Sequence, residues 1–167
     1  MLKLRKNKKG FTLVELIVVI AIMAVLAGTV AGVTVTQLNK RTDEANHNQA
    51  KKIADTIYEE LLANVGGTDI TPDKPDSNPI GASMQEIVEE AFGTSIIAWA
   101  KTGVTGNNLP SLQAGKNYRV QYHAKTDAAA AHYTVEYKGK QGNHKGDISY
   151  TITSTDGVKK VDNYQAS

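Results

Sequence analysis

Residues 8–20 read KKGFTLVELIVVI, in which two lysines and a glycine precede a long apolar run. Glu15 is the only charged residue between Phe11 and Val35. An α-helix over those residues would be about 37 Å long, which is enough to cross the hydrocarbon core of a bilayer. The stretch therefore predicts a membrane-spanning helix near the N-terminus, and the rest of the chain has to be arranged around it.

Glu15 distinguishes this segment from a simple membrane anchor. A carboxylate inside a bilayer costs several kcal/mol unless it finds a partner or reaches the interface. An anchor gains nothing from such a group. We therefore expect Glu15 to have a functional partner.

The same stretch resembles the N-terminus of prepilins of the type IV pilin superfamily, which carry a class III signal. A short basic leader ends at Gly10, and the following residues, Phe11-Thr12-Leu13-Val14-Glu15, agree with the family motif at every position. The resemblance implies cleavage between Gly10 and Phe11 and N-methylation of Phe11. It also implies that Glu15 pairs with the Phe11 amino group of a neighbouring subunit during assembly. It covers about the first 35 residues, so the remainder must be argued from its own pattern.

The basic character of the chain belongs to its first ten residues. Five of the 19 lysines and arginines lie there: Lys3, Arg5, Lys6, Lys8 and Lys9. We expect them to keep the N-terminus on the cytoplasmic side of the membrane. Removal of the leader, residues 1–10, changes the formal net charge from +2 to −3. A slightly acidic mature chain disfavours nucleic acid as a partner.

A general secretory signal is the alternative interpretation of the N-terminus. Such a signal would be cut after a small residue such as Ala27 or Ala31 and would release a soluble protein. Glu15 argues against it, because the carboxylate would lie inside the hydrophobic region that the signal requires.

The apolar segment, residues 11–35, carries a strip of small residues that includes Ala24, Gly28 and Gly32. The GxxxG spacing of the two glycines allows helices to approach closely in apolar surroundings. Glycines among β-branched residues also weaken a helix. In the family that the chain resembles, a proline often lies near position 32, so we predict a weak point between Ala24 and Thr34 with glycine as its source. A continuous helix with closely packed glycines is the alternative.

An amphipathic helical pattern continues from residue 37 to about Asn64. Apolar residues recur at three-and-four spacing on one side, and charged residues fill the other side. The apolar side includes Ala50, Ile53, Ala54 and Ile57, and the polar side includes Lys40, Asp43, Glu44, Lys51 and Asp55. One face should pack on a globular domain that comprises residues 36–167, and Gly66 and Gly67 should end the helix.

Loops around one short helix are predicted between the long helix and the C-terminal strands. Ser83 and Glu86 form a capping box that opens this helix, and Gly93 should kink or end it. Residues 68–79 form a polar loop whose aspartates do not have the spacing of a calcium-binding loop, so a solvated turn is favoured. Trp99 is expected in the core or at a subunit contact.

Alternation of apolar and polar residues begins after Lys116 and predicts strands at residues 118–122, 133–137 and 148–152. Asp156-Gly157 predicts a turn into a last short strand at residues 158–164. The predicted fold class is therefore α+β, with a long N-terminal helical spine packed by a C-terminal antiparallel sheet of three or four strands. The pilin resemblance implies the same architecture.

Motifs of catalysis or phosphate binding do not occur in the sequence, so we expect neither an enzyme nor a cofactor. The chain has no cysteine, which excludes thiolate chemistry. Its four histidines, His47, His123, His132 and His144, lack the spacing of helical metal ligands. His123 and His132 could be cross-strand neighbours on the solvent face of the sheet, where exposed polar positions are favoured over a metal site.

The resemblance implies a structural subunit of a type IV pilus that serves adhesion, motility or aggregation. The precursor would span the cytoplasmic membrane with its C-terminal domain outside, and the assembled pilus would be extracellular. Implied partners are further pilin subunits, a prepilin peptidase, an extension ATPase, a membrane platform protein and, before assembly, the membrane. Many Gram-negative type IV pilins close their C-terminal region with a disulfide, so the lack of cysteine favours a Gram-positive or other disulfide-free pilin.

Two other functions fit parts of the sequence. A pseudopilin of a type II secretion or DNA-uptake machine would share the N-terminal motif. A single-pass or monotopic binding protein that never polymerises would share only the apolar segment, and Glu15 argues against it.

Overall fold

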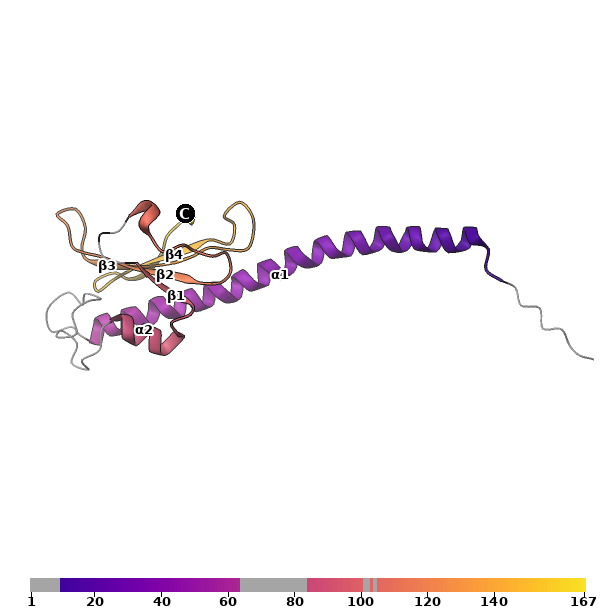
Figure 1. The fold of residues 1–167 in the computed structure, drawn as a ribbon. Coiled ribbons are helices and arrows are strands. Elements are labelled where there is room, and N and C mark those ends of the chain that lie inside the picture. The colour runs from indigo at the N-terminus through magenta and orange to yellow at the C-terminus, as the bar shows by residue number, and fades with distance from the viewer. Residues whose placement is uncertain (1–9, 64–83, 101–102, 104) are drawn as a thin grey trace, which may run out of the picture. The chain divides into compact units, whose positions relative to one another are not determined.

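The computed structural model describes residues 10–63, 84–100, 103 and 105–167. The chain divides into two compact units, Met1–Leu38 and Asn39–Ser167, which are described separately. One helix, α1 (Leu13–Ala63), contributes residues to both units (Figure 1). The predictions for Gly66, Gly67, Ser83 and the loop at residues 68–79 lie outside the described residues.

The described residues of the first unit are mostly helical, and none of them is buried in a core. Every residue from 10 to 38 is exposed, and a side chain added at Gly28 or Gly32 would meet nothing within 4 Å. The helix runs without a break through both glycines, as in the continuous alternative. The predicted weak point between Ala24 and Thr34 in an assembled state stays a prediction.

The second unit contains a five-stranded sheet with the order β1-β2-β3-β4-β5 (Figure 1). Its strands are β1 (Ile97–Ala100), β2 (Tyr118–His123), β3 (His132–Tyr137), β4 (Ile148–Thr153) and β5 (Gly157–Lys160). Strands β2 to β5 pair antiparallel, whereas β1 pairs parallel with β2 at the edge. The α+β class and the antiparallel meander are confirmed, while β1 is an additional strand and β5 is shorter than predicted.

Strand β1 follows the short helix α2 (Met84–Phe92). Gly93 ends α2 with a φ of 91°, a left-handed conformation that glycine adopts without strain, and its N–H donates to the Glu89 carbonyl at 2.8 Å. The prediction that Gly93 stops this helix is therefore confirmed. The Tyr118 N–H donates to the Ile96 carbonyl at 2.8 Å, and this bond joins the start of β1 to the start of β2.

The core lies between the α1 residues of the second unit and one face of the sheet. Ala50, Ile53, Ala54 and Ile57 on α1 are completely buried, as their spacing predicts. The alternating strand residues supply the opposite face: Tyr118, Val120, Tyr122, Tyr133, Val135, Tyr137, Ile148, Tyr150 and Ile152. Trp99 is partly buried and packs against this cluster, which confirms its predicted place at the core.

Asp43 is completely buried, although the helical pattern predicts it on the polar, solvent-facing side. Three residues donate to its carboxylate: the Tyr137 hydroxyl and the Lys140 amide at 2.8 Å, and the Gln141 amide and side chain at 3.1 Å. The prediction was wrong because the loop between β3 and β4, residues 138–147, folds over this turn of α1. Its N–H groups replace water around the carboxylate.

Glycine at position 146 is required by the same contact. A β-carbon at Gly146 would collide with the Asp43 carboxylate, and one at Gly139 would collide with the backbone of Gly146. The two glycines therefore let the loop approach itself and the helix closely. Burial opposes ionisation of Asp43, but the hydrogen bonds from Lys140, Tyr137 and Gln141 outweigh burial and lower the pKa of this carboxyl.

Replacement of Asp43 by asparagine should destabilise the second unit by about 2–3 kcal/mol at pH 7, because one amide cannot accept the bonds that the carboxylate accepts. Urea unfolding of the full chain in mild detergent, followed by tyrosine fluorescence, measures the difference. Glu44→Gln is the matched control, since Glu44 is an exposed residue of the same helix.

The destabilisation should also depend on pH. The folded pKa of Asp43 lies below its ordinary value of 3.8, so the ionised carboxylate contributes stability above about pH 4, and this contribution is lost as the pH falls through the lowered pKa. The gap between the wild type and Asp43→Asn should therefore narrow in acid. An equal gap at pH 3 and pH 7 would contradict the ionised role.

Candidate functional site

The residues predicted for cleavage and assembly lie at the start of α1. Gly10, Phe11 and Thr12 precede the helix, which begins at Leu13. The Phe11 side chain is 88% exposed, and nothing lies within 4 Å of a side chain built at Gly10. The Gly10–Phe11 bond is therefore on non-helical, accessible backbone, as a peptidase substrate requires.

Thr12 and Glu15 form a capping box at this helix start. The Thr12 amide and hydroxyl donate to Oε2 of Glu15 at 2.8 Å and 2.9 Å, and the Glu15 amide donates to the Thr12 hydroxyl at 3.3 Å. The threonine satisfies one of the free helical N–H groups while the glutamate binds back to the threonine. The Thr-x-x-Glu spacing in the sequence is the signal that indicates such a capping box. The prediction for Glu15 rests on its charge alone and does not include this role.

The capping box lowers the free-energy cost of placing the Glu15 carboxylate in an apolar environment. Two donors from its own chain bind Oε2, so the carboxylate of the separate subunit already has compensation. Oε1 receives no hydrogen bond from any residue of the described ranges. One carboxylate oxygen thus stabilises the helix start, and the other can accept a donor from outside the subunit.

The threonines further along the segment also satisfy their hydroxyl groups locally. Thr29 donates to the Leu26 carbonyl at 3.0 Å, Thr34 to Val30 at 2.8 Å and Thr36 to Gly32 at 3.1 Å. Such bonds remove the need for water around the hydroxyl groups. Within the part of the chain that the structure describes, α1 is the one helix long and apolar enough to cross a membrane.

A family model described as the prokaryotic N-terminal methylation motif matches residues 5–31. The chain carries the class III signal of type IV pilins and pseudopilins. Gly10, Phe11, Thr12 and Glu15 all lie inside the match, which confirms the resemblance drawn from the sequence. No curated protein and no solved structure matches the chain. The match ends before the second unit begins, so it does not bear on the fold of that unit.

The class III signal and the apolar helix fit a precursor anchored in the membrane. The motif marks a family of structural, generally non-enzymatic proteins that are processed by prepilin peptidase and assemble with other pilin subunits. Among the described residues, no three of the side chains that commonly bind metals are grouped where they could hold an ion.

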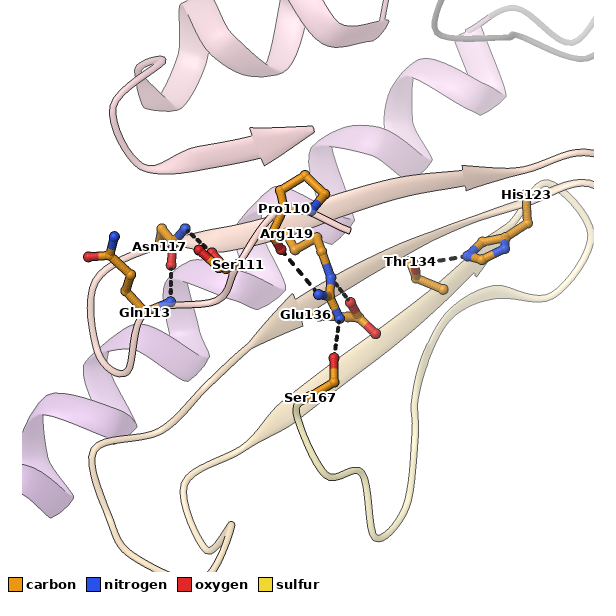
Figure 2. Close-up of polar contacts among 9 residues, drawn as sticks. All are labelled: Pro110, Ser111, Gln113, Asn117, Arg119, His123, Thr134, Glu136 and Ser167. Atoms are coloured by element: carbon orange, nitrogen blue, oxygen red, sulfur yellow. Dashed lines mark hydrogen bonds and ion pairs between the residues drawn. The ribbon is translucent and has the colours of Figure 1, made fainter. Parts of the chain in front are cut away.

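The sheet face that points away from α1 carries a polar network (Figure 2). Arg119 is only 4% exposed, forms an ion pair with Glu136 and donates to the Pro110 carbonyl at 3.2 Å and the Ser167 hydroxyl at 3.3 Å. Asn117 organises the preceding turn through Ser111 and Gln113. The bond to Ser167 holds the C-terminal end of the segment after β5 over the sheet, and the other bonds fix the segment before β2.

His123 and His132 are cross-strand neighbours, as predicted, and their rings stack at 4.6 Å with an interplanar angle of 11°. His123 Nε2 lies 3.2 Å from the Thr134 hydroxyl (Figure 2). Burial and the neighbouring His132 lower the pKa of His123, while Glu136 opposes the shift. The lowered pKa means that His123 is less readily protonated in the folded chain than in the unfolded chain.

The capping box can be tested by Thr12→Val, which removes the hydroxyl group and keeps the side-chain shape. Loss of an N-cap costs about 1 kcal/mol, so amide hydrogen exchange at Glu15 and Leu16 should become about fivefold faster in detergent micelles. Thr29→Val is the control, because the Thr29 hydroxyl bonds to Leu26 and caps nothing. Equal protection of the first turn in both variants would show that the capping box is not a stable feature.

His123 should make the second unit less stable in acid. The pKa of His123 is below its ordinary value of 6.5, so the unfolded chain binds the proton more readily, and stability falls as the pH drops below 6.5. His123→Gln should reduce the difference between urea midpoints measured at pH 7.5 and pH 5. An unchanged pH dependence in His123→Gln would refute this role.

Proposed function

We propose that this chain is the structural subunit of a type IV pilus, cleaved by prepilin peptidase and polymerised through its N-terminal helix into a surface filament for adhesion, motility or aggregation. One observation carries the proposal: an apolar helical segment with every residue exposed begins directly at a methylation motif. Such a surface is not stable in water. It requires lipid before assembly and the helices of other subunits afterwards.

Glu15 would give assembly its register. After cleavage, the new amino group of Phe11 carries a positive charge, and Oε1 of a neighbouring subunit's Glu15 is the acceptor that the capping box leaves available. Inside an apolar filament, a charge pair with additional hydrogen bonds is far better than a single buried carboxylate. The Thr12 bonds supply those additional contacts without competing for Oε1. Helices that stack out of register would lose the pair.

The leader would retain the precursor in the cytoplasmic membrane with the second unit outside, until the peptidase cuts between Gly10 and Phe11. Methylation of Phe11, an extension ATPase and a membrane platform protein complete the proposed pathway. Ala24, Gly28 and Gly32 would allow the close packing of helices and supply flexibility in the filament. The subunit itself would perform no catalysis.

Glu15→Ala should leave the protein processed but reduce the yield of sheared surface filaments by at least tenfold, because the assembled state loses its charge pair. Gly10→Ala should leave the protein uncleaved. Immunoblots of sheared fractions, electron microscopy and mass spectrometry of the mature N-terminus provide the readouts. Glu44→Gln should assemble normally, since this exposed carboxylate lies outside the apolar segment.

Normal filament yield from Glu15→Ala would contradict the pairing mechanism, and a mature chain that starts near residue 28 or 32 would contradict the cleavage site. The motif is shared with pseudopilins, so filament length decides between the two roles. Long filaments with this chain as their main subunit support a pilin. Its absence from such filaments, together with a secretion or DNA-uptake defect in a deletion strain, would support a pseudopilin.

A further inference from the structure

The stacked histidines, His123 and His132, lie on the sheet face that points away from α1. Their strand neighbours Tyr122 and Tyr133 are buried in the core, so alternation directs the two imidazoles to the opposite face. Both histidines are partly exposed, so an ion can reach them from solvent. Neither the N-terminal motif nor the proposed assembly mechanism uses this pair.

The pairing of β2 with β3 sets the distance between the two rings. His123 is directly opposite His132, and the ring centroids lie 4.6 Å apart. Two nitrogens bound to one tetrahedral zinc ion, at bond lengths of about 2.0–2.1 Å, lie about 3.4 Å from each other. The torsion that turns a histidine ring about its Cβ–Cγ bond is soft, so the two rings can bring a nitrogen each to one ion without movement of the strands.

His132 already has the hydrogen bond that a metal-binding histidine requires. Its Nδ1 lies 2.9 Å from the Ala130 carbonyl. A carbonyl oxygen only accepts, so Nδ1 is the donor and Nε2 of the neutral ring carries the lone pair. Metal-binding histidines typically donate their other ring N–H to a carbonyl or a carboxylate, which fixes the tautomer and the ring orientation.

His123 also keeps a ring nitrogen for an ion. Its Nε2 lies 3.2 Å from the Thr134 hydroxyl, which can donate or accept (Figure 2). In either case one nitrogen of the neutral ring carries a lone pair, and a bond of this length is weak enough to be replaced by a metal. Burial and the neighbouring His132 lower the pKa of His123, so a metal ion at neutral pH does not have to displace a proton from this ring.

The charged groups further along the same face do not oppose a cation. Arg119 and Glu136 form an ion pair and compensate each other. Glu136 is also the group that opposes the lowering of the His123 pKa by burial and His132, so its carboxylate favours positive charge at the pair.

We propose that His123 and His132 together bind one divalent transition-metal ion, Zn²⁺ or Cu²⁺. Imidazole nitrogens suit these ions, whereas Mg²⁺ and Ca²⁺ prefer oxygen ligands. Within the described part of the chain, no third side chain of the kind that binds metals joins the pair, so water completes the coordination. Sequence alone favours two exposed polar residues here, because it shows neither the stacked rings nor the bond from His132 Nδ1.

Isothermal titration of the full chain, produced without a histidine tag and kept in uncharged detergent micelles at neutral pH, tests the proposal. One Zn²⁺ should bind per chain, Cu²⁺ should bind more tightly, and Mg²⁺ should not bind detectably. His123→Gln and His132→Gln should each weaken the binding at least about tenfold, because even loss of a supporting hydrogen bond costs a metal site that much. His144→Gln is the control, since it removes an exposed histidine of another loop and leaves the pair intact.

Electron paramagnetic resonance of the copper-loaded wild type should show coupling to two imidazole nitrogens. This measurement decides the outcome even if a histidine variant misfolds, which circular dichroism reveals. Binding of Cu²⁺ without Zn²⁺ would identify a copper site and would support the proposal. Binding of neither ion, equal binding of Mg²⁺, coupling to fewer than two imidazoles, or equal losses in His144→Gln and His123→Gln would overturn it. The titration uses separate subunits, so a failed Glu15 experiment leaves its result independent.

Discussion

The constraint on which the structure depends is that α1 carries two apolar surfaces with different requirements. Residues 39–63 place apolar side chains on one face, and the sheet of their own unit buries them. Residues 11–35 are apolar around most of the helix, and all of them are exposed. The free energy gained by hydrophobic burial is roughly proportional to the apolar area that is buried. Exposure of this second surface to water is therefore strongly unfavourable. Burial of this surface would require lipid or other chains, and the class III signal at the same place fits that requirement.

Periodicity was sufficient to predict the elements whose partners are other apolar residues. The three-and-four spacing gave the buried face of α1, and alternation gave β2, β3 and β4 with their tyrosines directed inward. Strand β1 was missed because it has four residues, pairs parallel and lacks an alternating pattern. Asp43 was assigned to solvent because its donors, such as Tyr137 and Lys140, are far away in sequence. Local spacing carries no information about them.

The candidate sites likewise differ in whether the sequence alone could predict them. Gly10, Phe11 and Glu15 stay predictions, which the sequence allows because all the residues of the motif lie within one short stretch. The hydrogen bonds between Thr12 and Glu15 could also have been predicted, from the Thr-x-x-Glu spacing. They were missed because the charge of Glu15 already suggested a function, so its role in capping the helix was not considered. The adjacency of His123 and His132 could be predicted because the register of the strands follows from the alternating pattern.

The contacts of Arg119 and Asp147 have a consequence for the folding of the second unit. They hold the segment after β5 to the sheet through an ion pair, a hydroxyl and a backbone amide. The 167 residues contain no thiol, so this closure forms without electron transfer. Folding of the second unit is therefore independent of the redox potential of its compartment, and reducing agents should leave it intact. The second unit needs no thiol oxidoreductase in order to fold, and it keeps the same contacts under anaerobic conditions as in air.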